Sequence, residues 1–290
     1  MSSAASINPL ESPILQSVEL REEELDRERR LLEELVHPPP GPLIAVDLDD
    51  VLSQTNQEVA DWHNENYGTD MKTSDFLYYY YWKNKYWGDP KETFKKVAKF
   101  YETDRIYQSR PVEGAKDGLE ELKKLGYRLI IVTARSKDTA DQSWTWVQKY
   151  FPGCFESIVC TGQFTDGHKE GHEVVTRLSK AQVCNDLKAV LLIDDSAENA
   201  LQCATAEEPV PVLLFGDYEW NQRVSSRDDT QADSTFAVRF EREGGREFWK
   251  DEKLEIPAGA PLWRAANWSS AVQFVKERRY LGPPDETSKV

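Results

Sequence analysis

The chain is short of cysteine, of basic residues and of long apolar runs, and each shortage excludes a class of protein. Its 290 residues include four cysteines, with no CxxC pair and no histidine at metal-ligand spacing. We therefore expect free thiols in a reducing compartment rather than a disulfide framework or a zinc site. Asp and Glu number 51 against 36 Lys and Arg, for a formal net charge of −15. So acidic a protein is unsuited to hold a nucleic-acid polymer or an anionic membrane through its overall field.

The sequence also lacks the segments that carry proteins into or across membranes. No apolar stretch approaches the length needed to cross a bilayer. The start, Met1 to Ala5, has neither the basic residues nor the apolar region of a signal peptide, and Glu11 arrives early. We therefore expect a cytoplasmic protein, with the nucleus left open as an additional compartment.

The first part of the chain is unlike the rest. Residues 1–42 are predicted to hold a disordered start, a charged helix over 19–36 and a proline-rich linker at 38–42. Acidic and basic residues at helical spacing are typical of a solvated helix. The thin leucine stripe of this helix favours a surface position over a coiled coil. A protein partner on this helix is left open.

The remaining chain divides into three predicted parts. In residues 43–53 and 111–217, apolar strand-type runs alternate with helical patterns, which predicts a Rossmann-like α/β fold with a parallel sheet and helices on both faces. Residues 54–110 break this rhythm and hold 14 of the 32 aromatic residues, so we expect a small, mostly helical, aromatic-rich cap inserted after the first strand. Residues 218–290 are predicted to form a C-terminal appendage with a last helix over 268–276 and a tail.

Three predicted strands end in side chains that carry chemistry. In chain order these ends are Asp47-Leu48-Asp49 after Leu43–Val46, Thr133 after Arg128–Val132, and Asp194-Asp195 after Val190–Ile193. Lys180 lies between the last two in the sequence. The carboxyl ends of parallel strands are where α/β domains bind ligands. Carboxylates this close together repel one another and resist burial, so a divalent cation and a phosphoryl group would account for them.

Each of these motifs has a simpler explanation when taken alone. Asp47 and Asp49 could form a turn or a helix cap, and Asp194-Asp195-Ser196 could cap a helix. Lys180 could be a solvated helix residue, with Lys188 or Lys169 in its place. The three strand ends, with these residue types in this order, favour a common site.

This set of motifs resembles the haloacid dehalogenase (HAD) superfamily of aspartate-nucleophile phosphatases, over roughly Leu43 to Asp217. The run Asp-Leu-Asp-Asp-Val-Leu from Asp47 to Leu52 and the aromatic insert after it are similar to the 5′(3′)-deoxyribonucleotidase-type branch. The resemblance implies a Mg²⁺-dependent phosphomonoester hydrolase that acts on a small phosphorylated metabolite, with a nucleotide among the candidates. An insert at this point would be a cap that closes the site and selects the substrate.

The resemblance also implies a role for each motif residue. Asp47 would be the nucleophile that forms an aspartyl-phosphate, and Asp49 would protonate the leaving oxygen and then activate water, a role that favours a raised pKa. The Mg²⁺ ligands would be the Asp47 carboxylate, the Asp49 backbone carbonyl and Asp194, with Asp195 holding a metal-bound water or orienting the lysine. Thr133, Ala134 and Lys180 would bind the phosphoryl oxygens.

We expect the residues that contact the substrate to lie in the aromatic insert and beside Thr133. The five consecutive aromatics from Tyr78 to Trp82 cannot all face a core, whichever period applies. Either these rings hold a small cap together, or a few of them stack on a flat substrate part such as a nucleobase. The candidates for substrate contact are Phe76, Tyr79, Tyr81, Trp82, Trp87 and Arg135, with Gln163 and His168 in the loop that follows.

Two other readings stay open on the sequence. A phosphotransferase or mutase would use the same nucleophile and differ only in the group that accepts the phosphoryl. A non-catalytic interaction protein could use the N-terminal helix, the aromatic segment or the C-terminal part as contact surfaces. A dehalogenase is disfavoured because Asp49 belongs to the phosphatase pattern, and a cap of this size would obstruct a polypeptide substrate.

Overall fold

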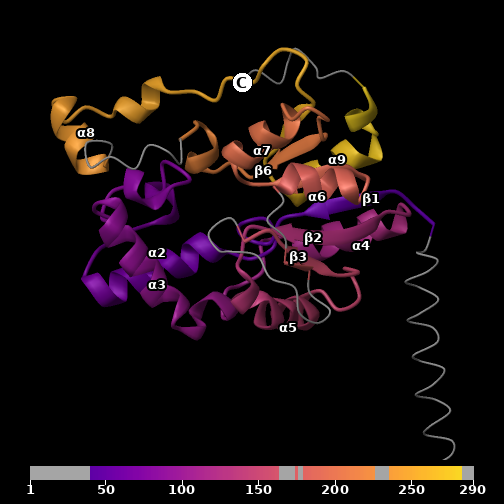
Figure 1. Cartoon of the computed structure of the whole chain (residues 1–290), viewed down its shortest axis with the longest axis horizontal. Helices are drawn as coiled ribbons and strands as arrows, with labels where there is room; N and C mark the ends of the chain where they lie inside the picture. Colours follow the sequence, from indigo (N-terminus) through magenta and orange to yellow (C-terminus); the bar gives the residue numbers. More distant parts are fainter. Residues whose placement is uncertain (1–39, 163–173, 176–178, 226–234, 283–290) are drawn as a thin grey trace, which may run out of the picture. The chain divides into compact units, whose positions relative to one another are not determined.

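The computed structural model describes residues 40–162, 174–175, 179–225 and 235–282 (Figure 1). The predicted helix over 19–36 and the loop candidates Gln163, His168 and Lys169 lie outside the described residues. The described residues from Pro42 onward belong to one compact unit. No helix in the described part of the chain is both long enough and apolar enough to cross a membrane.

A parallel sheet forms the centre of this unit. In the described residues it has seven strands in the order β4-β3-β2-β1-β5-β6-β7, and each neighbouring pair is parallel. The strands are β1 (Leu43–Val46), β2 (Arg128–Thr133), β3 (Ile158–Cys160), β4 (Val174–Val175), β5 (Ala189–Asp194), β6 (Val212–Phe215) and β7 (Leu262–Ala265). The order runs outward in both directions from β1 and β5, so the topological switch point lies between them. The predicted Rossmann-like α/β class is confirmed.

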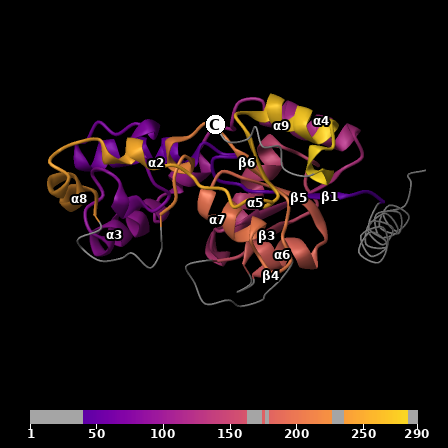
Figure 2. The same cartoon turned by 90° about the horizontal axis from the view of Figure 1, so that it is seen from above.

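Alternate side chains of the strands feed two hydrophobic layers. On one face, Ile44 and Val46 pack with α4 (Ala115–Lys124), α5 (Ala140–Tyr150) and α9 (Trp268–Lys276). On the other face, Leu43 and Ala45 pack with α6 (Lys180–Asp186) and α7 (Ala197–Ala204). Figure 2 shows α4 and α9 on one side of the sheet and α6 on the other. All four cysteines are buried and free, as expected.

The aromatic segment between β1 and β2 is mostly helical. Its elements are α2 (Thr55–Tyr67), η1 (Thr73–Asp75), η2 (Tyr81–Lys83), α3 (Pro90–Tyr101) and η3 (Asp104–Tyr107). Side chains of α2, η2, α3 and η3 share one apolar cluster with Phe76 and Trp87, and this cluster also includes Trp220 from beyond β6. Asp89 caps helix α3 by accepting from the backbone N–H of Glu92, and Pro90 opens its first turn.

The C-terminal part of the chain leaves the sheet and returns to it. After β6 come η5 (Glu219–Asn221), α8 (Phe236–Arg242) and η7 (Phe248–Asp251). Phe248 packs against Leu77 and Tyr78 of the aromatic segment, and Phe236 and Phe240 of α8 join this cluster. Figures 1 and 2 both show α8 toward the end of the unit that carries α2 and α3. The chain then adds β7 to the sheet, α9 to its face and η8 (Arg279–Leu281). Part of residues 218–290 therefore completes the central sheet, which the sequence pattern did not indicate.

Candidate active site

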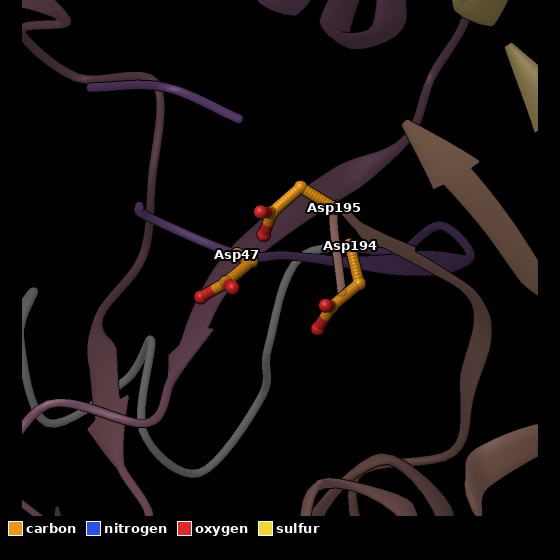
Figure 3. Close-up of side chains that lie close together, drawn as sticks. All are labelled: Asp47, Asp194 and Asp195. Carbon is orange, nitrogen blue, oxygen red and sulfur yellow. The ribbon is translucent and has the colours of Figure 1, made fainter. Parts of the chain in front are cut away.

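Three carboxylates converge at the switch point of the sheet. Asp47 directly follows β1, Asp194 ends β5 and Asp195 is the next residue. One carboxylate oxygen from each of the three residues lies within 4.8 Å of the other two (Figure 3), although the residues are only 5%, 0% and 5% exposed. The register of the strands brings them together, since Val46 pairs with Ile193. The expected meeting of these strand ends is therefore observed.

Lys180 completes this cluster. Its Nζ lies 2.8 Å from Asp47 Oδ2 and 2.6 Å from Asp194 Oδ2, and its side chain is fully buried. The lysine is held at the start of α6, where Ser179 caps the helix by accepting from the backbone N–H of Gln182. Lys188, the alternative in the sequence, lies exposed beyond the other end of α6.

The acid cluster carries more negative charge than Lys180 can balance. Burial raises the pKa of Asp47 to about 7, even though Lys180 pulls it down. Burial, together with the charges of Asp50, Asp194 and Asp47, also raises the pKa of Asp195. Burial lowers the pKa of Lys180, but Asp194 and Asp47 outweigh that effect and raise it. Three carboxylates against one ammonium leave a buried excess of negative charge, which a divalent cation would offset.

Each of the three acids is also held by an N–H donor. Asp47 Oδ1 accepts from the backbone N–H of Leu48 at 2.7 Å, and Asp194 Oδ1 accepts from that of Ser196 at 2.9 Å. Asp195 Oδ2 accepts from the indole N–H of Trp220 at 2.7 Å. The carboxylates are therefore fixed in orientation before any ligand arrives.

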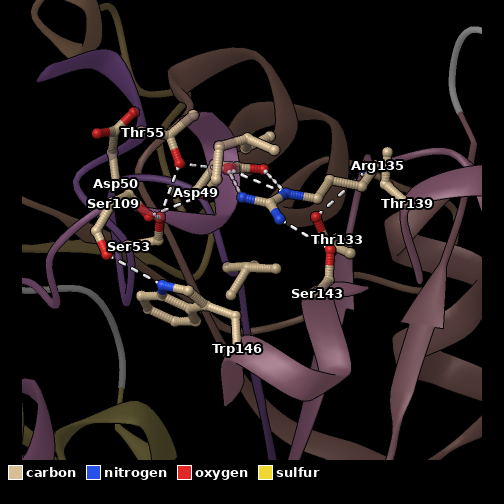
Figure 4. Close-up of polar contacts among 12 residues, drawn as sticks. Asp49, Asp50, Ser53, Thr55, Ser109, Thr133, Arg135, Thr139, Ser143 and Trp146 are labelled. Atoms are coloured by element: carbon tan, nitrogen blue, oxygen red, sulfur yellow. Dashed lines mark hydrogen bonds and ion pairs between the residues drawn. The ribbon is translucent and has the colours of Figure 1, made fainter. Parts of the chain in front are cut away.

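Asp49 does not join this cluster. Its carboxylate faces Arg135, with Nη2 at 2.6 Å from Oδ1 and Nε at 3.0 Å from Oδ2, and it accepts from Thr55 Oγ1 at 2.5 Å (Figure 4). Arg135 also donates to Ser143 Oγ at 2.8 Å. Burial raises the pKa of Asp49, but Arg135 outweighs that effect, so its pKa lies below the ordinary value. The expected raised pKa of Asp49 is wrong, because its nearest charge is an arginine from another strand end.

The second strand end has the predicted residues in place. Thr133 closes β2 and is fully buried, and β2 pairs directly with β1. Its Oγ1 accepts a long hydrogen bond of 3.3 Å from the backbone N–H of Arg135. Ala134, between them, is partly exposed. Both residues lie at the sheet edge that carries Asp47, while any contact with a phosphoryl group remains a prediction.

The aromatic candidates separate into two groups. Phe76, Trp82 and Trp87 are 1%, 3% and 0% exposed, and Trp87 stacks on Tyr81 with 4.3 Å between ring centroids. In this structure these three offer almost no surface to a ligand, which supports their packing role. Tyr79 and Tyr81 remain partly exposed. Burial raises the pKa of Tyr79, and Asp195 and Asp47 raise it further, so among these candidates its phenol is the one placed near the acid site.

Sequence reasoning missed Thr55 and Trp220 as partners of the acids. Thr55 opens α2 and bonds to an aspartate six positions earlier, a spacing that a search for local contacts could have found. Trp220 lies 25 positions from Asp195 in a segment without a clear pattern, so the sequence carried no signal for it.

Comparisons with known proteins identify the family. The family model described as "5' nucleotidase, deoxy (Pyrimidine), cytosolic type C protein" matches residues 41–233. No curated protein is significantly similar to the chain.

Solved structures with a similar fold include L-2-haloacid dehalogenase from Xanthobacter autotrophicus, with 13% identity, a TM-score of 0.45, and coverage of 82% of this chain and 99% of that one. A HAD family hydrolase from Deinococcus radiodurans R1 with bound phosphate and sodium shows 14% identity, a TM-score of 0.41, and coverage of 62% and 83%. A HAD-superfamily hydrolase from Geobacter sulfurreducens PCA shows 16% identity, a TM-score of 0.40, and coverage of 62% and 93%. The matched family model spans most of the chain and includes every strand-end motif, so the chain belongs to the cytosolic type C 5′-deoxynucleotidase family and is a HAD-type phosphatase.

Proposed function

We propose that this chain is a Mg²⁺-dependent phosphomonoesterase that uses Asp47 as its nucleophile, with a nucleoside monophosphate as the first candidate substrate. The observation that carries the proposal is the convergence of Asp47, Asp194 and Asp195 within 4.8 Å at the switch point. Lys180 lies against two of these carboxylates. The nucleotide part is supported by the family and by Tyr79, a partly exposed ring near the acids. A cytosolic location is proposed on the family alone.

The donor set fits Mg²⁺. The three acids of the cluster offer only oxygen ligands, they are buried, and Lys180 alone does not balance their negative charge. We assign the metal to the carboxylates of Asp47 and Asp194 and to the backbone carbonyl of Asp49, with Asp195 holding a metal-bound water. When bound, Mg²⁺ would offset charge on the phosphoryl oxygens and on the acids.

The remaining chemistry belongs to side chains of this chain. A carboxylate oxygen of Asp47 attacks phosphorus, so that a new P–O bond forms while the ester P–O bond breaks. Lys180 orients that carboxylate and counters its charge. Thr133 and the backbone N–H of Ala134 hold phosphoryl oxygens at the end of β2. Water then hydrolyses the aspartyl-phosphate and releases inorganic phosphate.

Asp49 is proposed as the acid and base of these two steps. Its lowered pKa keeps the carboxylate ionised, which is the form that takes a proton from water in the second step. The first step needs a proton on Asp49, and therefore needs its carboxylate to leave Arg135 and turn toward Asp47. The pair with Arg135 thus describes a resting arrangement of the site.

The proposal is tested with purified full-length protein, Mg²⁺ and a panel of phosphomonoesters that includes deoxynucleoside and ribonucleoside monophosphates. Release of phosphate should require Mg²⁺ and should disappear in Asp47→Asn. Asp117→Asn, an exposed change of the same type on α4, should leave turnover unchanged. Asp49→Asn should lower kcat strongly, and turnover equal to that of the wild type would contradict the assignment of Asp49 as acid and base. Transfer of the phosphoryl to an added alcohol or sugar, in place of release, would instead identify a phosphotransferase.

A further inference from the structure

The turn after β6 is tied firmly to the edge of the sheet. Its residue Asn221 is fully buried, and Nδ2 donates to the carbonyls of Phe215 and Gly216 at 3.0 Å each. Arg264, on β7, donates to Asn221 Oδ1 at 2.6 Å. The 3₁₀ turn η5 is therefore held by β6 and by the edge strand β7, so the side chains that it carries have fixed positions.

Gly216 lets this turn bring an aromatic ring close to the backbone. Its φ is +88°, a value that favours glycine, and a Cβ there would lie 2.1 Å from the ring of Tyr218. The Tyr218 hydroxyl donates to the backbone carbonyl of Asp50 at 2.8 Å. The turn is thereby connected to the loop that carries Asp47 and Asp49.

Trp220 occupies the space between this ring and the acid cluster. Its indole stacks on Tyr218 with 4.2 Å between centroids and 9° between planes, and it makes a T-shaped contact with Phe76 at 6.3 Å and 85°. The ring is 2% exposed. Rings on two sides hold the indole so that its N–H points at Asp195 Oδ2, at 2.7 Å.

We propose that Trp220 is a positioning residue for the metal of this site: its indole N–H fixes one oxygen of Asp195, so that the other faces the metal or its water. The indole N–H is a donor only, so this bond needs an acceptor and suits a carboxylate. Groups that orient a metal ligand in this way change metal affinity by about 10- to 100-fold when they are removed. The inference rests on the Mg²⁺ site of the proposed function.

The test compares Mg²⁺ binding by full-length wild-type protein and Trp220→Phe, using isothermal titration calorimetry with MgCl₂ and no substrate. Phenylalanine keeps an aromatic ring against Tyr218 but removes the N–H together with the five-membered ring of the indole, so the control must lose the same volume at a buried site. The matched control is Trp146→Phe, which removes another buried indole N–H, bonded at 3.0 Å to the Ser109 carbonyl instead of to an acid. We expect Trp220→Phe to raise the Mg²⁺ dissociation constant about 10-fold or more, and Trp146→Phe to change it less than about 2-fold.

Thermal unfolding gives a second readout that does not depend on activity. The rise in Tm on adding Mg²⁺ should shrink in Trp220→Phe and stay at the wild-type size in Trp146→Phe. Trp220→His returns an N–H donor on a ring and should recover part of the affinity, whereas Trp220→Leu should not.

The outcomes separate this inference from the proposed function. Wild-type Mg²⁺ affinity in Trp220→Phe, or an equal loss in Trp146→Phe, overturns the role of Trp220 and leaves the metal site standing. A wild-type protein that binds no Mg²⁺ overturns both.

Discussion

Replacing Lys180 with methionine tests whether the charge balance of the acid cluster is as the structure shows. The side chain is fully buried, and its ammonium lies 2.6 Å and 2.8 Å from two carboxylates. Each pair is worth about 6 kcal/mol at an effective dielectric constant of 20, before the cost of desolvation. Removing one partner of a buried pair typically costs about 3–5 kcal/mol, because the remaining charge is left without compensation. We expect Lys180→Met to lose this much stability at pH 8 in EDTA.

The loss should depend on pH in a defined direction. The pKa of Asp47 is about 7 in the folded protein against 3.8 ordinarily, and removal of Lys180 would raise it further. An acid with a raised folded pKa binds its proton more tightly in the folded state, so its destabilising effect grows as pH rises and fades as pH falls. The gap between variant and wild type should therefore be smaller at pH 5.5 than at pH 8.

The assay is urea unfolding followed by circular dichroism in EDTA, repeated with Mg²⁺. The control is Lys116→Met, an exposed lysine on α4, which should change stability by no more than about 0.5 kcal/mol. Mg²⁺ should stabilise Lys180→Met more than the wild type, because a cation then meets the carboxylates without a competing ammonium. A variant as stable as the wild type at pH 8 in EDTA would refute the charged, buried cluster.

Three further predictions concern titratable groups. Arg135→Met should shift the basic limb of the kcat/KM profile to higher pH, because the first step needs a proton on Asp49 and Arg135 holds the pKa of Asp49 low. The matched change Arg128→Met, which removes a partly buried arginine paired with Glu156, should not shift it, and identical profiles for Arg135→Met and the wild type would contradict the role of the Arg135–Asp49 pair. Burial raises the pKa of Glu198 to about 7, so its ionisation destabilises the fold increasingly from about pH 4.5 to 7. In urea unfolding, Glu198→Gln should therefore have a free energy of unfolding about 1–2 kcal/mol above the wild type at pH 8 and equal to it near pH 4. Burial lowers the pKa of His63 to about 4, so the wild type should lose up to about 3 kcal/mol between pH 6.5 and 4 that His63→Gln does not lose.

The centre of the site could be predicted from the sequence because short runs of neighbouring residues mark its strands and their ends. Apolar runs that end in Asp47, Thr133 and Asp194 identify three strands, and parallel pairing then brings their ends to one edge. Lys180 required one further step, since nothing in the sequence places its helix. The structure shows that a serine cap starts α6 beside the acids and directs the lysine between two of them.

The burial of the aromatic segment was predicted from the sequence only in part. The run Tyr78–Trp82 was expected to divide between buried and open positions, and the structure buries its two ends while Tyr79, Tyr80 and Tyr81 stay partly exposed. Periodicity cannot say which rings are buried, because here the chain makes bends and a single 3₁₀ turn, η2, instead of a regular helix. Which rings are buried depends on packing partners far along the chain, such as Phe248, which packs against Tyr78.

Contacts between residues far apart in the sequence determine the parts of the fold and site that local patterns did not predict. Strand β7 has only four residues and includes Arg264, so it lacks the apolar run that marks the central strands, and it becomes visible only through its pairing with β6. The Trp220 to Asp195 bond likewise depends on a turn held by that strand.

Asp49 shows how much chemistry depends on such contacts. Its neighbours in the sequence are acids, and like charges alone would raise its pKa, as a general acid requires. Arg135, 86 positions away, reverses the sign by bonding both carboxylate oxygens. The proposed acid step therefore begins with the separation of an ion pair, and we expect the phosphoryl anion of the substrate to compensate the charge of Arg135 during that step. On this argument the substrate's own charge prepares Asp49 to donate its proton, so a neutral ester analogue should bind without separating the pair.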